Sequence, residues 1–201
     1  MIKKIWDALF TKSELLQDIY LIAQLNDKVM PIDRGEIYED PLDSFLKLNF
    51  YGEVTGGGTQ LTVNNEIAYC DVEIKLNKEP TGLIISDIIR KIENLGAPKG
   101  SKLIIEKTGE KIPFGKLEGL AIYLDGINLS DEVYKNSDTE ALALNIRKLI
   151  GINDDIIRYS QGNTETALYF YSTSFEDMKS KISNFIATEP ECENSRIVQI
   201  A

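Results

Sequence analysis

The chain has 201 residues, of which 43% are hydrophobic, and this is enough for a packed core in one large domain or two small ones. It carries 22 basic and 32 acidic residues, so its formal net charge of −10 opposes binding to nucleic-acid phosphates and to anionic membranes. The absence of histidine excludes serine or cysteine nucleophiles activated by imidazole, and every metal site with a histidine ligand.

The sequence also favours a cytoplasmic protein without a membrane anchor. Asp7 and the polar run from Thr11 to Ser13 interrupt the first apolar stretch before it reaches the length of a signal peptide. No stretch approaches the roughly 18 apolar residues that a membrane span needs. Cys70 and Cys192 are far apart in the sequence, which favours buried thiols in a reducing compartment over a disulfide. We expect no cofactor and no metal ion.

The N-terminal half alternates helical and strand patterns. Leu15, Ile19 and Ile22 recur at spacings of three and four residues, which predicts an amphipathic helix with Ser13 as its N-cap. After three consecutive glycines, an Asn-Asn pair at 64–65 separates two strand-like runs and suits a tight hairpin turn. The predicted elements are a helix over 13–26, a short helix over 42–48, strands over 59–63 and 66–76, a helix over 83–95 and a strand over 102–107.

The C-terminal half begins after residues 108–116, a segment with glycine and proline that we expect to be a linker. Gly151 stands where a helix over 139–150 would end, and Ser174 stands where an N-cap would begin the last helix. The predicted elements are a strand over 118–125, a helical turn after Ser130, a helix over 139–150, strands over 155–160 and 164–172, a helix over 175–186 and a strand over 196–200.

This order predicts an α+β fold with largely antiparallel sheets and helices on one face. The C-terminal half follows the β-α-β-β-α-β order of a ferredoxin-like, split β-α-β unit, and the N-terminal half resembles the same plan without its first strand. Traces of an internal repeat give three alignments: Gly58-Thr59 with Asn163-Thr164, Glu66-Ile67-Ala68 with Glu165-Thr166-Ala167, and Ser101-Lys102 with Ser195-Arg196. Two tandem ferredoxin-like units and one continuous sheet are both compatible with these patterns. The expected domains are a helical region at 1–50, a first unit at 51–112 and a second unit at 113–201.

Gly56, Gly57 and Gly58, followed by Thr59, form the most distinctive local motif. Glycine-rich loops bind phosphates through backbone N–H groups, but such loops stand between a strand and a helix N-terminus. Here the glycines precede a strand, and the sequence matches neither Walker A nor G-x-G-x-x-G. A bulge or a close backbone approach is the simpler interpretation, and a ligand-binding loop is the alternative.

A cluster of charged residues lies between 33 and 43, upstream of the glycines. Paired carboxylates can act in acid–base catalysis or bind Mg²⁺ or Ca²⁺, but the segment lacks the pattern of an EF-hand and contains an arginine. A solvated turn with an internal ion pair and an acidic docking surface are the other interpretations. No catalytic or metal-ligating residue is assigned, and the predicted partner-binding residues are Asp33, Arg34, Glu36, Tyr38, Glu39, Asp40 and Asp43.

Tyrosines form a third candidate set. Tyr69 lies beside Asp71 and Glu73 on one predicted strand, and Tyr169 and Tyr171 lie on the corresponding strand of the second half. Tyrosines on the outer face of a sheet suit an interface, and they also suit ordinary cross-strand packing.

Several strings in the chain resemble a bacterial family of hypothetical proteins with no assigned activity. These strings are IDRGEIYEDPL, GEVTGGGTQL, EIAYCDVEI, GAPKGSKL, PFGKLEGLAIYLDG and DEVY. The resemblance spans most of the chain and transfers no catalytic residue. In size, acidity and lack of histidine, the chain is also similar in type to cytosolic immunity proteins of polymorphic or contact-dependent toxins. That similarity implies a protein partner, such as a basic toxin domain.

The sequence therefore leads to three functional hypotheses. The first is a non-catalytic binding protein, an immunity-type inhibitor that neutralises a toxin through an acidic surface. The second is a small-ligand-binding protein or enzyme that combines Gly56–Gly58 with the carboxylates of 33–43. The third is a structural homo-oligomeric module. We expect a protein partner and neither a nucleic acid nor a membrane.

Overall fold

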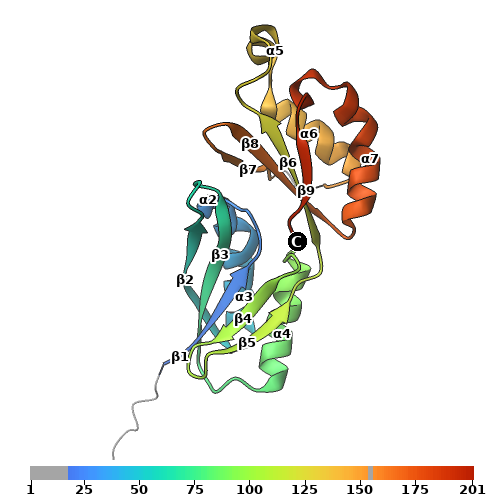
Figure 1. Cartoon of the computed structure of the whole chain (residues 1–201). Coiled ribbons are helices and arrows are strands. Elements are labelled where there is room, and N and C mark those ends of the chain that lie inside the picture. Colours follow the sequence, from blue (N-terminus) through green and yellow to red (C-terminus); the bar gives the residue numbers. More distant parts are fainter. Residues whose placement is uncertain (1–17, 154–155) are drawn as a thin grey trace, which may run out of the picture.

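Two antiparallel sheets organise the chain in the computed structural model, which describes residues 18–153 and 156–201 (Figure 1). The first unit contains β1 (Ile19–Leu25), α2 (Pro31–Arg34), the π-helical turn η1 (Gly35–Glu39), α3 (Asp40–Leu48), β2 (Gly52–Leu61), β3 (Ile67–Leu76), α4 (Gly82–Asn94), β4 (Ser101–Ile105) and β5 (Glu110–Phe114). The second unit contains β6 (Glu118–Asp125), α5 (Asp131–Asn136), α6 (Thr139–Ile150), β7 (Arg158–Gln161), β8 (Glu165–Ser172), α7 (Phe175–Thr188), the 3₁₀ turn η2 (Pro190–Cys192) and β9 (Arg196–Gln199).

Both sheets have the strand order of a ferredoxin-like unit. The first sheet runs β2-β3-β1-β4-β5, and the second runs β7-β8-β6-β9, so the first and third strands of each unit lie in the middle. All the strand pairs within these sheets are antiparallel. The fold is therefore α+β with two tandem β-α-β-β-α-β units, and the first unit carries β5 as an additional edge strand.

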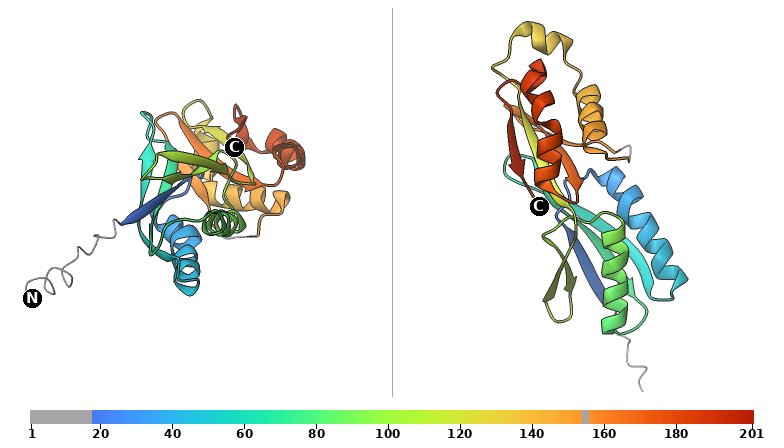
Figure 2. Two further views of the ribbon diagram at one scale, coloured as in Figure 1. Left: turned by 90° about the horizontal axis from the view of Figure 1, so that it is seen from below. Right: turned by 90° about the vertical axis from the view of Figure 1, so that its right-hand side faces the viewer.

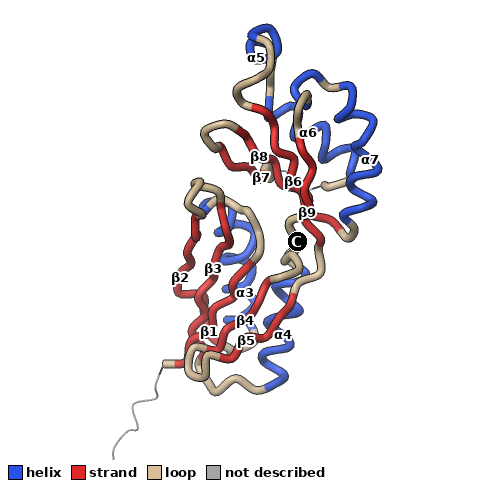
Figure 3. Tube along the Cα trace, in the orientation of Figure 1, coloured by secondary structure: helices blue, strands red, loops and turns tan. Residues whose placement is uncertain are grey.

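Helices cover one face of each sheet, as Figures 2 and 3 show. In the first unit, α3 and α4 lie side by side and bury leucine and isoleucine side chains against β1, β3 and β4. In the second unit, α6 and α7 pack in the same way on β6 and β8. Among the described residues, every helix is too short or too polar to span a lipid bilayer.

The helix predicted over 13–26 is wrong in its described part, because residues 19–25 form β1. Leu21, Ala23 and Leu25 are buried and alternate with half-buried residues, so the same apolar run satisfies a period of two. Pairing with β3 on one edge and β4 on the other decides in favour of the strand. The remainder of the predicted helix, including Ser13, lies outside the described residues.

Two other boundaries differ from the prediction. The expected linker over 108–116 contains β5, which pairs with β4 across a turn at Gly109, where φ is +71°. The strand expected over 59–63 begins earlier, at Gly52, so the three glycines lie within β2. The predicted strand over 118–125 and helix over 139–150 are confirmed at the same ends.

Two of the three alignments of the internal repeat join equivalent positions, and one does not. Ser101 begins β4 and Ser195 directly precedes β9, the fourth strand of each unit. Glu66 and Glu165 occupy equivalent positions, at the end of the turn that leads into the third strand of each unit. Gly58, in contrast, lies within β2, whereas Asn163 lies in the turn between β7 and β8, so that alignment is wrong. The repeat is therefore clearer in the strand order of the two units than in their residue identities.

Candidate functional site

Residues 31–48 form one helical segment that carries all the residues predicted to bind a partner. Pro31 occupies the first helical position, where a missing N–H leaves no backbone bond unmade. The segment contains the π turn η1, a feature that is frequent at functional sites. Its buried side consists of residues spaced by four: Arg34, Tyr38, Leu42 and Leu46. This side lies against the first sheet.

The opposite side of the segment is exposed, and we call it the acidic stripe: Ile32, Asp33, Glu36, Asp40 and Leu48. Glu36 and Asp40 are exposed and Asp33 is half-buried, and none of the three forms an ion pair or side-chain hydrogen bond with a described residue. Ile32 and Leu48 are 87% and 79% exposed, so large apolar side chains flank the carboxylates. Acidic and apolar groups therefore lie together on one accessible surface.

Two members of the predicted partner-binding set are buried and cannot reach a partner. The Arg34 guanidinium donates from Nε to Glu39 Oε1 at 2.6 Å and from Nη1 to Thr59 Oγ1 at 2.8 Å, which ties the helix to β2. Tyr38 is 1% exposed, and its hydroxyl donates to Asp27 Oδ2 at 2.7 Å. Burial, followed by the charge of Asp27, raises the pKa of Tyr38 well above its usual value.

Asp43 has a local structural role. Its Oδ2 accepts from Lys47 Nζ at 2.8 Å, and its Oδ1 accepts from the backbone N–H of Val54 at 3.0 Å. The hydrogen bond from Lys47 lowers the pKa of the Asp43 carboxyl, and the backbone donor lowers it further. Asp43 therefore joins α3 to the start of β2, and the acidic stripe retains Asp33, Glu36 and Asp40 as its charged members.

The predicted glycine loop is a strand, so it does not form a phosphate cradle. Gly57 faces the helical segment, where a Cβ would lie 2.5 Å from the Asp71 carbonyl oxygen, 2.8 Å from Glu39 Oε1 and 2.9 Å from Arg34 Nε. Close approach of the charged side chains therefore requires glycine at position 57. Gly56 and Gly58 differ, because a Cβ at either position would meet no atom within 4 Å.

Asp27 and Arg158 form the most deeply buried ion pair between described residues, and sequence reasoning missed both of them. Arg158 Nε donates to Asp27 Oδ1 at 2.9 Å and Nη2 donates to Oδ2 at 3.2 Å, and the Asp27 side chain is 0% exposed. The two residues lie 131 positions apart, in different units, and no spacing in the sequence connects them. With Tyr38, they link the helical segment, the end of β1 and β7.

The tyrosines of β8 also lie between the two units. The Tyr171 hydroxyl accepts from the backbone N–H of Lys28 at 3.0 Å and donates to the Asn26 carbonyl at 3.3 Å. The Tyr169 hydroxyl is 2.6 Å from Ser160 Oγ. Both side chains are buried, whereas Tyr69 remains half-buried on the outer face of the first sheet. Tyr171 is thus an interface residue within the chain, whereas the hydrogen bond of Tyr169 lies within the second unit.

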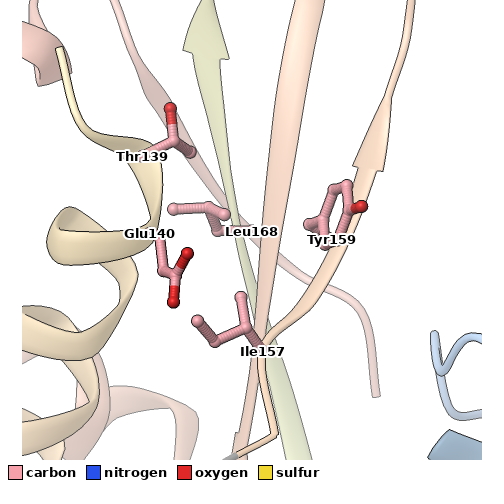
Figure 4. A pocket seen from close by; sticks show the side chains of 5 residues that line it. All are labelled: Thr139, Glu140, Ile157, Tyr159 and Leu168. Carbon is pink, nitrogen blue, oxygen red and sulfur yellow. The ribbon is translucent and has the colours of Figure 1, made fainter.

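Two cavities in the described part of the chain lie away from the acidic stripe and from the three glycines. One of about 340 Å³ opens between the start of α6 and β7, where Thr139 and Glu140 face apolar side chains (Figure 4). Another, of about 330 Å³, lies between the turns at 63–66 and 162–165. Neither cavity is lined by the acidic stripe or by the three glycines.

The described residues contain no cluster of three or more cysteine, aspartate or glutamate side chains arranged to hold a metal ion. Cys70 and Cys192 are buried free thiols. Burial raises the pKa of the Cys192 thiol to about 12, so this thiol is protonated at neutral pH. These observations assign no nucleophile or metal ligand to the candidate surface.

No family model and no curated protein sequence matches this chain. Solved structures with weak similarity include a protein of unknown function from Galdieria sulphuraria, which is 10% identical with a TM-score of 0.27 and covers 91% of this chain and 96% of that chain. A putative monooxygenase from Lactobacillus acidophilus is 12% identical with a TM-score of 0.28, at coverages of 92% and 94%. The first two RRM domains of a yeast poly(U)-binding protein are 11% identical with a TM-score of 0.23, at coverages of 91% and 99%. Likenesses this weak support no statement about activity.

Proposed function

We propose that the protein is a non-catalytic, cytoplasmic binding protein whose acidic stripe docks on a basic protein partner, in the manner of an immunity-type inhibitor of a toxin. The observation that carries this proposal is the composition of the stripe. Asp33, Glu36 and Asp40 have no internal ion-pair partner among the described residues, and Ile32 and Leu48 are exposed beside them.

The physical argument concerns association and anchoring. An enzyme that attacks an anionic substrate, such as a nuclease, has a basic active site, and an acidic inhibitor associates rapidly with that site. Apolar side chains at the ends of the stripe would contribute the desolvated contacts that hold an interface together. A net charge of −10 adds long-range attraction toward a basic partner.

The ligand-binding or enzymatic alternative lacks a comparable observation. Its carboxylates at 33, 36 and 40 lie on the exposed side of a helix, and its glycines lie in β2. A Cβ at Gly57 would meet the Asp71 carbonyl and the Arg34–Glu39 pair, so this glycine faces side chains of its own chain and not an open site. We therefore favour protein binding over catalysis.

The test uses the protein that the neighbouring gene encodes. Isothermal titration calorimetry at low and high salt measures its affinity for this protein. Glu36→Lys with Asp40→Lys should weaken binding at least about tenfold, because two attractive charges become repulsive. Ile32→Ala should weaken binding at both salt concentrations, since its contribution is apolar.

The matched control reverses two exposed acids of the second unit, Asp131→Lys with Glu132→Lys, which changes the net charge equally. This control should bind more weakly only at low salt, through the loss of long-range attraction. Absence of any complex, or an equal loss in both double variants at high salt, would contradict the proposal.

A further inference from the structure

Within residues 18–153 and 156–201, no helix or strand covers the central rows of the face of the first sheet that lies opposite α3 and α4. Its residues alternate with the buried residues of each strand, and the strand pairing aligns them in rows. The upper row, in the order β2-β3-β1-β4-β5, is Gly58, Asp71, Gln24, Lys102 and Pro113. The lower row, in the same order, is Gly56, Glu73, Ile22, Ile104 and Lys111.

Charge is distributed unevenly across these rows. Both acids, Asp71 and Glu73, lie on β3, on one side of the central strand β1. Both lysines, Lys102 and Lys111, lie on β4 and β5, on the other side. The two lysines form no ion pair with a described residue. These two rows are therefore acidic on one half and basic on the other, whereas the next row along the strands carries Glu53 on β2 and Lys75 on β3.

A β-bulge between Val54 and Gly56 accounts for glycine at position 56, whereas no contact with a described residue accounts for Gly58. A Cβ at Gly56 or Gly58 would meet no atom within 4 Å, and neither residue has a positive φ. Glycine within a strand weakens the strand, and it often marks a place where another chain or ligand approaches closely. Gly56 and Gly58 leave a strip without side chains along β2, beside the acids.

We propose that this face forms a symmetric homodimer interface, in which a second copy packs face to face about a two-fold axis parallel to β1. That axis places β2 opposite β5 of the other copy and β3 opposite β4. Gly58 then lies opposite Pro113, Asp71 opposite Lys102, and Ile22 opposite the second Ile22. In the lower row, Glu73 lies opposite Ile104 and Gly56 opposite Lys111. The pairing of opposite charges in these two rows is therefore that of Asp71 with Lys102, which an isologous contact makes twice.

A two-fold axis perpendicular to the strands does not give this pairing, because it would place the acids of β3 opposite the same acids. The charge pattern therefore selects a single relative orientation of the two copies, with their strands nearly aligned as in packed sheets. The acidic stripe lies on the helical side of the sheet, so the dimer would leave it accessible. This inference is independent of the proposed partner.

Sedimentation velocity over a range of protein concentrations provides the first test, and a concentration-dependent dimer is expected for the wild type. A wild type that stays monomeric at about 100 µM, a concentration two orders above the micromolar Kd of a modest interface, would overturn the proposal.

Gly58→Val separates the interface from the fold. Valine favours strands, and its Cβ at position 58 would meet no atom of the described chain within 4 Å, so the thermal stability of the protomer should be unchanged or higher. The same side chain would collide with the second copy, and the dimer dissociation constant should rise at least about tenfold. The control is Gly82→Val, at a glycine of α4 that also has open space around it. A dimer unaffected by Gly58→Val would overturn this choice of face.

A charge exchange tests the orientation. Asp71→Lys alone and Lys102→Asp alone should each weaken the dimer at least about tenfold, because each places like charges opposite one another. The variant that combines both substitutions restores opposite charges across the axis and should recover most of the affinity. Failure of the combined variant to recover, with both single variants folded, would exclude the parallel axis.

Discussion

At the scale of single residues, the arrangement of Asp27, Arg158 and Tyr38 is the most consequential feature. Removing Asp27 and Arg158 from water is costly, and their attraction offsets this cost only because both carboxylate oxygens accept a guanidinium hydrogen bond. Tyr38 adds a third donor to the same carboxylate. The cluster is therefore sensitive to the loss of any one charge.

Asp27→Asn should destabilise the protein by about 3 to 5 kcal/mol, because the substitution removes a fully buried carboxylate charge that pairs with the Arg158 guanidinium. The control is Asp177→Asn, which breaks an exposed ion pair with Lys181 and should cost at most about 0.5 kcal/mol. Urea denaturation at pH 7 measures both values. Equal effects of the two substitutions would show that the buried pair contributes no more than a surface pair.

At the scale of secondary-structure elements, the helical segment 31–48 and β2 depend on one another. Arg34 reaches across to Thr59, Asp43 accepts a hydrogen bond from the backbone of β2, and Gly57 allows the close approach. These contacts hold the segment so that one side is buried and the acidic stripe is exposed. The proposed partner surface therefore depends on residues that do not themselves touch a partner.

Gly57→Ala should destabilise the protein by about 1 to 3 kcal/mol, because the new methyl group would overlap the Asp71 carbonyl and the Arg34–Glu39 pair. Gly35→Ala, in the helical segment 31–48, should instead stabilise the protein by about 0.5 to 1 kcal/mol. Alanine is the better helix former, and its Cβ would have open space there. Thermal denaturation measures the two shifts, and the same sign for both would contradict this account.

At the scale of the whole molecule, the two ferredoxin-like units are joined through buried tyrosines as well as through the ion pair. Tyr171 of β8 exchanges hydrogen bonds with the backbone at Asn26 and Lys28. Burial, and after it the charge of Asp27, raises the pKa of Tyr171 well above its usual value. The folded contact therefore requires neutral tyrosine side chains.

Stability should consequently decrease as the pH rises above about 10, the pKa of an unfolded tyrosine. Below that pH both states hold the proton, and above it the unfolded state loses a proton that the folded state retains. Tyr38 and Tyr171 should each lower the free energy of unfolding by about 1.4 kcal/mol for each pH unit above that value. Tyr171→Phe should remove the contribution of Tyr171 from this slope. Urea denaturation from pH 8 to 11 measures the slope. The control is Tyr134→Phe at an exposed tyrosine, which should leave the slope unchanged. If Tyr171→Phe also left the slope unchanged, the raised pKa of Tyr171 would be contradicted.

Local signals in the sequence predict most elements of the second unit. The helix over 139–150 is defined by a side-chain cap at Asp138 and by Gly151, which adopts a φ of +87°. The last helix begins where Ser174 caps it, as predicted. These signals act within one turn of the chain, so they can be recognised without knowledge of what packs against them.

The first unit was harder to predict because its decisive contacts are non-local. β1 has an apolar pattern that fits a helix and a strand equally well, and only its two neighbouring strands distinguish them. The residues predicted to bind a partner all fall on one helical segment, but the sequence could not tell which of them face outward. Arg34 is buried through its contact with Thr59, which lies 25 residues away on β2. Tyr38 is buried through its contact with Asp27, which lies 11 residues away, after the end of β1.

By itself, the sequence determined the composition limits, the caps and turns, the α+β class and the segment that carries the acids. The tertiary structure decided that residues 19–25 are a strand, that Gly57 accommodates an ion pair, and that Asp27 meets Arg158. The physical reason is the separation in sequence between the residues that interact. Caps, turns and periodicity depend on neighbouring residues, whereas sheet partners and buried charges depend on residues that only the folded chain brings together.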